Sequence, residues 1–289
     1  MALTLNDIIQ DVAQKAMIDT QSQTNMTNLI RWVNIVNNDI NNRYTWPWLA
    51  SRTTISTVVD TEGTSTITVD CTLSSTSVAG TGTTFVSTDV GRFIQFGSSN
   101  DWYKIVGRTS NTAITIEPAY VLATQTGMDF TIRTLSYDLP SDMKRLYDVR
   151  QFRSPTKLVQ VNTRMFDMYT PSQTSTGSPR AYYLFTYSNP QSLTGQQYAI
   201  SFEPIPSAAM VVEVRYLRIP PSLSVGTDIS VIPANYQHLL IDGTLVHAYQ
   251  YQNNPSTGGQ KQVYEAGIQQ MKLEMPQSVD THHVIQPCD

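Results

Sequence analysis

The period of the hydrophobic residues changes along the chain, from a helical repeat before about residue 50 to a strand repeat after it. Near the start, apolar residues recur three and four positions apart, which places them on one face of a helix. They are Leu5, Ile8, Ile9, Val12, Ala13 and Ala16. Thr4 followed by Asp7 resembles a capping box, with Asp in place of the usual Glu. A second helix is predicted from about Gln23 to Tyr44, and Trp46-Pro47-Trp48 ends it because proline lacks an amide hydrogen.

From about residue 52 to residue 132, apolar and polar residues alternate instead, which is the period of half-buried strands. The alternation is clearest over residues 66–73, and four short runs continue it. They are RFIQF (92–96), DWYKIVG (101–107), TAITIEP (112–118) and DFTIRT (129–134). Several short strands with Gly and Asn between them favour a small β-sandwich or barrel. Gly80-Thr81-Gly82 fits a hairpin turn within it.

The pattern after residue 136 mixes strands and helices. Residues 137–152 predict a strand end, a proline turn and a short helical turn, and residues 161–173 predict a short helix that closes at Pro171. Strands around Tyr182, Ile200 and Val214 are expected to form a small antiparallel sheet. A long helix is predicted over residues 233–252, with Pro233 in its first turn. A last helix opens at residues 255–256, and Pro276 stops it.

These elements predict an α+β fold: an α-helical bundle body with a small antiparallel sheet, an inserted all-β domain and an extended C-terminal tail. The predicted body comprises residues 1–51 and 133–276, the insertion residues 52–132, and the tail residues 277–289, which have no periodicity and are expected to be flexible.

Composition excludes some classes of protein. Only 15% of the 289 residues are charged and the net charge is −4, which argues against a dedicated nucleic-acid binder but fits a channel wall that does not grip DNA. Two cysteines, Cys71 and Cys288, predict no disulfide framework. The sequence shows no signal peptide and no apolar run of about 20 residues. A soluble protein made in the cytoplasm, with no membrane partner, is therefore expected.

Motifs for catalysis are missing from the sequence, so no catalytic residue, cofactor or metal is predicted. His282-His283 lacks a third ligand at metal-site spacing, and His238 and His247 are too far apart on one helix to bind one ion. Scattered acids in the insertion are interpreted as loop and turn residues, although a glycosidase pair is not ruled out. They are Asp60, Glu62, Asp70, Asp89 and Asp101.

Two groups of aromatic residues are candidates for contacts with other molecules. Trp46-Pro47-Trp48 is favoured as a core anchor, with a subunit interface as the alternative. Tyr182, Tyr183, Tyr187 and Tyr198 suit sugar stacking, subunit contacts or plain strand alternation.

Five segments, taken in order, resemble the head-to-tail adaptor proteins of short-tailed bacteriophages, the group that includes tail tubular protein A. They are the N-terminal helical pair ending at Trp48, LPSDMKRLYDV (139–149), GSPRAYY (177–183), FEPIP (202–206) and IPANYQHLLIDGTLVHAY (232–249). The insertion is similar to small β domains of phage neck and tail proteins.

The resemblance implies a structural virion protein of the neck, not an enzyme. Twelve copies would form a ring beneath the portal protein, pass genomic DNA without reading its sequence, and dock the tail nozzle or tail tube protein and tail fibres. The portal would meet a set of tail residues, and neighbouring subunits would meet a set of aromatic ones. These sets are Val279, His282, His283, Val284 and Ile285 for the portal, and Trp46, Trp48, Tyr236 and Tyr249 for the subunit interface.

Two other classes remain open at this point. The Tyr-rich and Thr-rich β region also suits a carbohydrate-binding tail spike, fibre or adhesin. An enzyme, such as a depolymerase or cell-wall hydrolase, is the third possibility, and no motif argues for it.

Overall fold

The computed structural model describes residues 2–154, 156–169, 175–188 and 195–275. The chain forms two compact units. The first, here called the helical unit, comprises Met1–Ser51, Asp142–Leu146 and Tyr216–Asp289. The second, called the strand unit, comprises Arg52–Ser141 and Tyr147–Arg215. Each unit is described by itself below.

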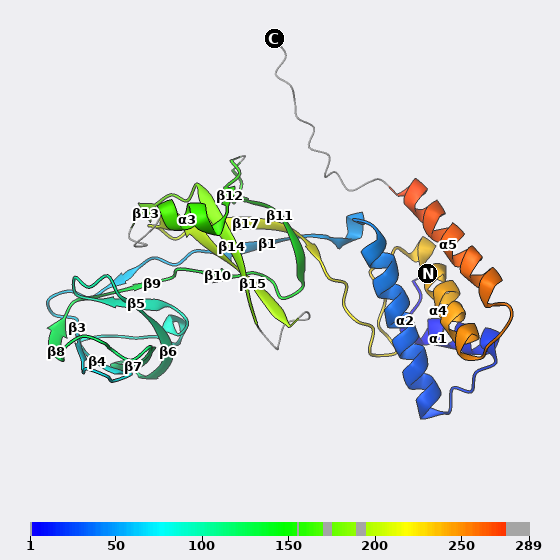
Figure 1. Cartoon of the computed structure of the whole chain (residues 1–289), viewed down its shortest axis with the longest axis horizontal. Helices are drawn as coiled ribbons and strands as arrows, with labels where there is room; N and C mark the ends of the chain where they lie inside the picture. Colours follow the sequence, from blue (N-terminus) through cyan, green and yellow to red (C-terminus); the bar gives the residue numbers. More distant parts are fainter. Residues whose placement is uncertain (1, 155, 170–174, 189–194, 276–289) are drawn as a thin grey trace, which may run out of the picture. The chain divides into compact units, whose positions relative to one another are not determined.

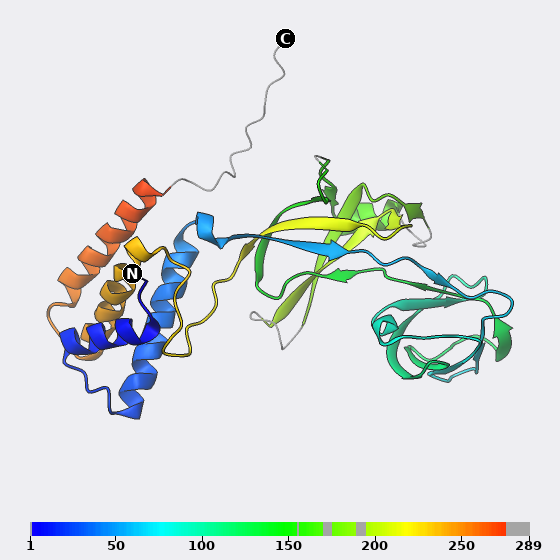
Figure 2. The ribbon, with the colours of Figure 1, turned by 180° about the vertical axis from the view of Figure 1, so that it is seen from behind.

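Four helices make up most of the helical unit, and Figures 1 and 2 show them grouped together. They are α1 (Leu5–Ala16), α2 (Gln23–Arg43), α4 (His238–Tyr251) and α5 (Thr257–Glu274), with two 3₁₀ turns, η1 (Pro47–Leu49) and η3 (Ala234–Tyr236). Helix α4 packs against each of the other three, and it buries residues on most of its circumference. The helices of the N-terminal and C-terminal segments therefore share one core.

Local signals explain where these helices begin and how closely they pack. Thr4 caps α1: its hydroxyl accepts the Asp7 amide at 3.2 Å, while the Asp7 carboxylate accepts the Thr4 amide at 2.9 Å. Gly243 allows α4 to approach α2 and α5, because a Cβ there would lie 2.5 Å from Val36 Cγ1 and 2.8 Å from Tyr264 Cε2. The predicted capping box and the helices α1, α2 and α5 are confirmed.

An eight-stranded antiparallel sheet fills the first part of the strand unit, in the order β2-β9-β5-β6-β7-β4-β3-β8. Its strands are β2 (Thr61–Glu62), β3 (Thr68–Cys71), β4 (Ser77–Thr81), β5 (Phe93–Phe96), β6 (Trp102–Ser110), β7 (Ala113–Glu117), β8 (Gln125–Met128) and β9 (Phe130–Arg133). A 3₁₀ turn, η2 (Ser87–Asp89), precedes β5. Thirteen buried residues form its core, with Phe96, Tyr103 and Tyr120 in mutual ring contact. The predicted strands of this all-β region are confirmed.

Smaller sheets make up the rest of the strands. One has the order β10-β15-β14-β12 and another pairs β13 with β16, while β1, β17 and β11 form a three-stranded sheet in that order. Their bounds are β1 (Ala50–Ser56), β10 (Tyr137–Asp138), β11 (Met143–Gln151), β12 (Val159–Val161), β13 (Thr176–Gly177), β14 (Ala181–Ser188), β15 (Gln196–Glu203), β16 (Ile205–Pro206) and β17 (Val211–Arg218). Helix α3 (Thr163–Tyr169) packs on β14, and the short helix expected there is confirmed.

Two local predictions are wrong. The helical turn expected within residues 137–152 is the nine-residue strand β11. Lys144, Arg145 and Leu146 favour helix locally, but pairing in a sheet overrides that preference. The strand around Val214 does not join those around Tyr182 and Ile200, because β17 lies in the sheet with β1 and β11. In addition, the helix expected from Pro233 opens with the 3₁₀ turn η3, and its α-helical part begins at His238.

The fold class is therefore mixed α/β with mostly antiparallel sheets. The division into a body of residues 1–51 and 133–276 with an insertion at 52–132 stays a prediction, and so does the helical bundle as the body of the protein. The flexible tail predicted at residues 277–289 lies outside the described residues.

Candidate assembly surfaces

Aromatic residues at the end of α2 are held by hydrogen bonds within the helical unit. The Trp46 indole donates to the Ile40 carbonyl at 2.6 Å, and the Trp48 indole donates to Asn41 Oδ1 at 2.9 Å. The two indoles stack with centroids 4.7 Å apart, and Tyr44 meets Trp46 edge-on. Trp46 is 2% exposed, whereas Trp48 is half-buried. Trp46 is thus a core residue of the single chain, and Trp48 keeps a surface that a neighbour can contact.

The other two residues predicted for a subunit interface lie on the C-terminal elements. Tyr236, in η3, donates its hydroxyl hydrogen to the Glu274 carboxylate on α5. This bond raises the pKa of Tyr236 and lowers the pKa of Glu274. Tyr249 is half-buried on α4. The subunit contacts of Trp46, Trp48, Tyr236 and Tyr249 stay a prediction.

A groove of about 490 Å³ runs between α2, α4 and α5. Arg43 bridges two acids in it, with Nη2 2.8 Å from Asp39 and Nη1 2.5 Å from Glu265. The Tyr264 hydroxyl donates to Asp39 at 2.8 Å. The Arg43 bond lowers the pKa of Glu265, while burial and the Asp39 carboxylate raise the pKa of Tyr264. Since these polar groups bond one another, the cluster ties α2 to α5 rather than presenting free groups to a substrate.

His247 lines the same groove from α4. Burial lowers its pKa, and the nearby Asp39 carboxylate opposes that effect. His238 is exposed at the start of α4, where its ring bonds the Asn235 carbonyl. The two histidines therefore occupy different surroundings, as their spacing predicts.

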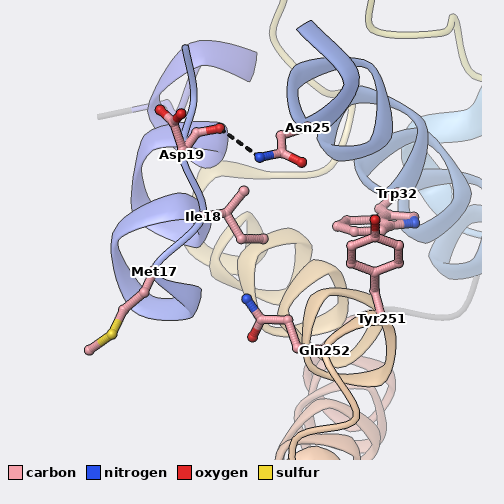
Figure 3. Close-up of a pocket in the computed structure, with 7 residues that line it drawn as sticks. All are labelled: Met17, Ile18, Asp19, Asn25, Trp32, Tyr251 and Gln252. Atoms are coloured by element: carbon pink, nitrogen blue, oxygen red, sulfur yellow. Dashed lines mark hydrogen bonds between the residues drawn. The ribbon is translucent and has the colours of Figure 1, made fainter. Parts of the chain in front are cut away.

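A second, smaller cavity of about 150 Å³ lies near the ends of α1 and α4 (Figure 3). The rings of Trp32 and Tyr251 lie next to each other on one side of it, with centroids 5.5 Å apart and tilted planes. The Asn25 amide donates to the Asp19 carbonyl at 2.9 Å. The cavity is smaller than the several hundred cubic ångströms typical of sites for organic ligands.

Three acids of residues 52–132 form ion pairs or hydrogen bonds within the fold. Asp89 pairs with Arg92 at 2.9 Å and Asp60 with Arg133 at 2.7 Å, while Asp70 accepts the Gly127 amide at 2.8 Å. Two of the carboxylates considered for glycoside hydrolysis are thus bound to arginines. Cys71 is buried, which raises its pKa to about 12 and keeps the thiol protonated.

Within residues 2–154, 156–169, 175–188 and 195–275, no three His, Cys, Asp or Glu side chains cluster closely enough to hold a metal ion. In the same part of the chain, no helix has the length and hydropathy that spanning a membrane requires. The residues predicted to meet the portal, Val279, His282, His283, Val284 and Ile285, lie outside the described residues, as does Cys288.

Comparison with protein families decides the class. The model of the SU10 adaptor protein family matches residues 88–284, which is well over half of the chain. The chain belongs to the SU10 adaptor protein family. This is a family of phage head-to-tail adaptors, so the adaptor resemblance is confirmed and the chain is a structural phage protein. No curated protein matches the chain significantly.

The extent of the SU10 adaptor match is informative. It contains four of the five segments that carried the resemblance, but not the N-terminal helical pair. It begins at residue 88, inside the predicted insertion, so strands β5 to β9 belong to the part that the family shares.

Sequence reasoning missed two features of this SU10-family chain. The Asp39–Arg43 pair has the i, i+4 spacing of a helical ion pair, which could have been noticed, but nothing in the sequence connects it to Glu265. The second feature is a group of exposed basic residues on and near α3, which come from loops and short elements without a period. They are Arg153, Lys157, Arg164 and Arg180.

Proposed function

We propose that copies of this chain form a ring beneath the portal of a phage head, extend the DNA channel and provide the docking platform for the tail. The observation that carries the proposal is the adaptor family match over residues 88–284. The proposed place is the neck of the virion, and the proposed stoichiometry is twelve.

In this proposal, the helices of the body pack side by side around the channel, and residues 52–132 project towards the tail nozzle, tail tube protein or fibres. Trp48, Tyr236 and Tyr249 contact the neighbouring subunit, while Trp46 supports Trp48 from the core. The low charge of the chain, with 15% charged residues and a net charge of −4, limits both self-repulsion between copies and adhesion to passing DNA.

Residues 277–289 are proposed to contact the portal, with Val279, His282, His283, Val284 and Ile285 at the contact. Ordering such a segment only on the portal would make ring formation depend on a finished head. Deletion of Gln277–Asp289 is expected to leave a folded monomer that no longer binds portal rings. Unchanged portal binding by the truncated chain would refute this role.

Mass photometry of the purified chain, alone and mixed with the portal of its own phage, tests the function. The proposal predicts a large ring-sized complex that forms only when portal is present. A stable trimer that does not bind the portal would contradict the proposal and would favour the spike or fibre alternative. Binding of host glycans by that trimer would then be measured.

A further inference from the structure

The strand unit carries a surface that combines basic and apolar side chains. Between Arg150 and Arg180 the sequence holds five basic residues and one acid, in a chain whose net charge is −4. Arg150 pairs with Asp148, and the other four basic residues are exposed. Four large apolar side chains are also exposed in this segment. The set, here called the arginine–methionine surface, is Phe152, Arg153, Lys157, Val159, Arg164, Met165, Met168 and Arg180.

Backbone pairing places these residues together. Arg150 and Lys157 form an isolated β-bridge. Val159 pairs with Ala181, and the Val159 amide donates to the Arg180 carbonyl at 3.0 Å. Helix α3 is anchored to β14 beside them, because Phe166 stacks on Tyr183 and the Thr163 hydroxyl bonds the Tyr183 hydroxyl at 3.0 Å. With Phe166 facing inward, Met168 remains 72% exposed and Val159 64% exposed.

The composition of this surface fits a protein partner better than a nucleic acid. Arginine, methionine and aromatic residues are enriched in the cores of protein interfaces, whereas nucleic-acid surfaces are more strongly basic and more polar. The complementary surface would carry acids beside exposed apolar residues.

The helical unit of the same sequence presents such a surface. On and beside α1, Asp7, Asp11 and Asp19 are exposed, together with Val225, Ile229 and Met17, the last being 93% exposed. Asp228, between Val225 and Ile229, is half-buried and its carboxylate accepts the Ser224 and Val225 amides. The Leu5 amide bonds the Asp228 carbonyl at 2.8 Å and Thr4 bridges to Ile229, so residues 225–229 lie beside the first turn of α1. Asp7 and Asp11 are four residues apart on the helix, and Met17 and Asp19 follow its last turn. Together these residues are here called the α1 face. Lys15 is its basic residue.

We propose that the arginine–methionine surface of one copy docks on the α1 face of the next copy. The contact joins two different surfaces, so it repeats from copy to copy and closes into a ring when the rotation allows. This inference rests on the proposed function, since it names the surfaces through which the ring is built.

Charge reversal on each surface tests the contact. One variant carries Lys157→Glu and Arg164→Glu, and the other carries Asp11→Lys and Gln14→Lys, all at exposed positions. Asp7 is left intact because it caps α1. Each variant alone is expected to assemble on the portal at least about tenfold more weakly, because like charges then face each other. The measurement is the mass of the portal-bound ring, with circular dichroism to verify that each variant folds.

An equal mixture of the two variants tests most directly whether the two surfaces contact each other. Each reversed surface can then meet the oppositely reversed surface of the other variant, so the account predicts that the mixture regains ring assembly. Arg52→Glu with Lys104→Glu is the matched control for the first variant, since it makes the same change in charge as Lys157→Glu with Arg164→Glu at exposed positions outside the surface, and it should assemble normally.

The outcomes separate this inference from the proposed function. Portal rings that form normally with both single variants would overturn the inference and leave the adaptor function standing. A defect that mixing does not rescue would also overturn it, as would a loss of duplex DNA binding with unchanged assembly.

If the wild-type chain instead assembles without the portal, zero-length crosslinking of that oligomer, made from mixed isotope-labelled and unlabelled copies, tests the contact. Lys157 joined to Asp11 or Asp19 between copies supports the contact, and its absence refutes it.

Discussion

The two units use their arginines differently. In the strand unit, Arg92 is 7% exposed and its guanidinium bonds Asp89, Thr61, Thr134 and two backbone carbonyls. In the helical unit, Arg43 lies at a half-exposed groove with Asp39 and Glu265. Water can replace the partners of Arg43 but not those of Arg92. The strand unit thus holds Arg92 by polar contacts made in its interior, whereas the helical unit holds Arg43 by ion pairs at its surface.

The largest effect is expected from Arg92→Met. It leaves Asp89 buried without its cation, which should cost about 3–5 kcal/mol of the free energy of unfolding of the strand unit. Hydrogen exchange with mass spectrometry, at increasing urea, resolves the two units.

Arg43→Met is the matched change in the helical unit, and about 1 kcal/mol or less is expected because its ion pairs are partly solvated. If Arg92→Met and Arg43→Met lower the free energy of unfolding equally, the two arginines do not differ as described.

Gly243→Ala probes the apolar packing of the helical unit. The added Cβ meets Val36 and Tyr264, so we expect a loss of about 1–3 kcal/mol, measured by urea unfolding followed at 222 nm. Gly258→Ala, in the first turn of α5 with no atom within 4 Å of the added Cβ, is the control and should be neutral or mildly stabilising. A harmless Gly243→Ala would show that the helices are not closely packed there.

Thr4→Ala removes the side-chain cap of α1. The free energy of opening α1 is expected to fall by about 1 kcal/mol. Hydrogen exchange at low urea should show this as faster exchange of the α1 amides alone. Thr27→Ala is a control: that hydroxyl bonds a carbonyl inside α2, at an exposed position, and caps no helix end. If α1 amides exchange no faster in Thr4→Ala, the local signal is not what starts the helix.

The smallest effect concerns pH. Burial lowers the pKa of His247 below its ordinary 6.5, so the unfolded chain takes up a proton first as the pH falls. The helical unit should therefore lose stability as the pH falls from about 6.5 through the lowered pKa, and be insensitive to this group above that window. His247→Gln should remove this contribution to the pH dependence of the free energy of unfolding, which urea titrations at several pH values measure. If the free energy of unfolding of His247→Gln varies with pH as it does in the wild type, His247 is not the group responsible.

How much the sequence predicts depends on whether an element is specified by its own residues, whichever unit contains it. Helices α1, α2 and α5 and strands β5, β6, β7 and β9 were predictable because each is specified by its own period and caps. Strand β11 was not, since Lys144 and Arg145 favour helix until a sheet pairs them. The partner of β17 is likewise set by tertiary pairing.

The candidate surfaces show a similar limit. The burial of Trp46 was favoured in advance, while the arginine–methionine surface became visible only when pairing brought Lys157, Val159 and Arg180 together.

The central claim is that this adaptor builds a ring on the portal. Electron cryomicroscopy of the chain reconstituted with the portal of its own phage tests it most directly. We expect twelve copies in a closed ring, coaxial with the portal and continuing its channel. Copies bound off the axis, or a trimer free of the portal, would contradict it.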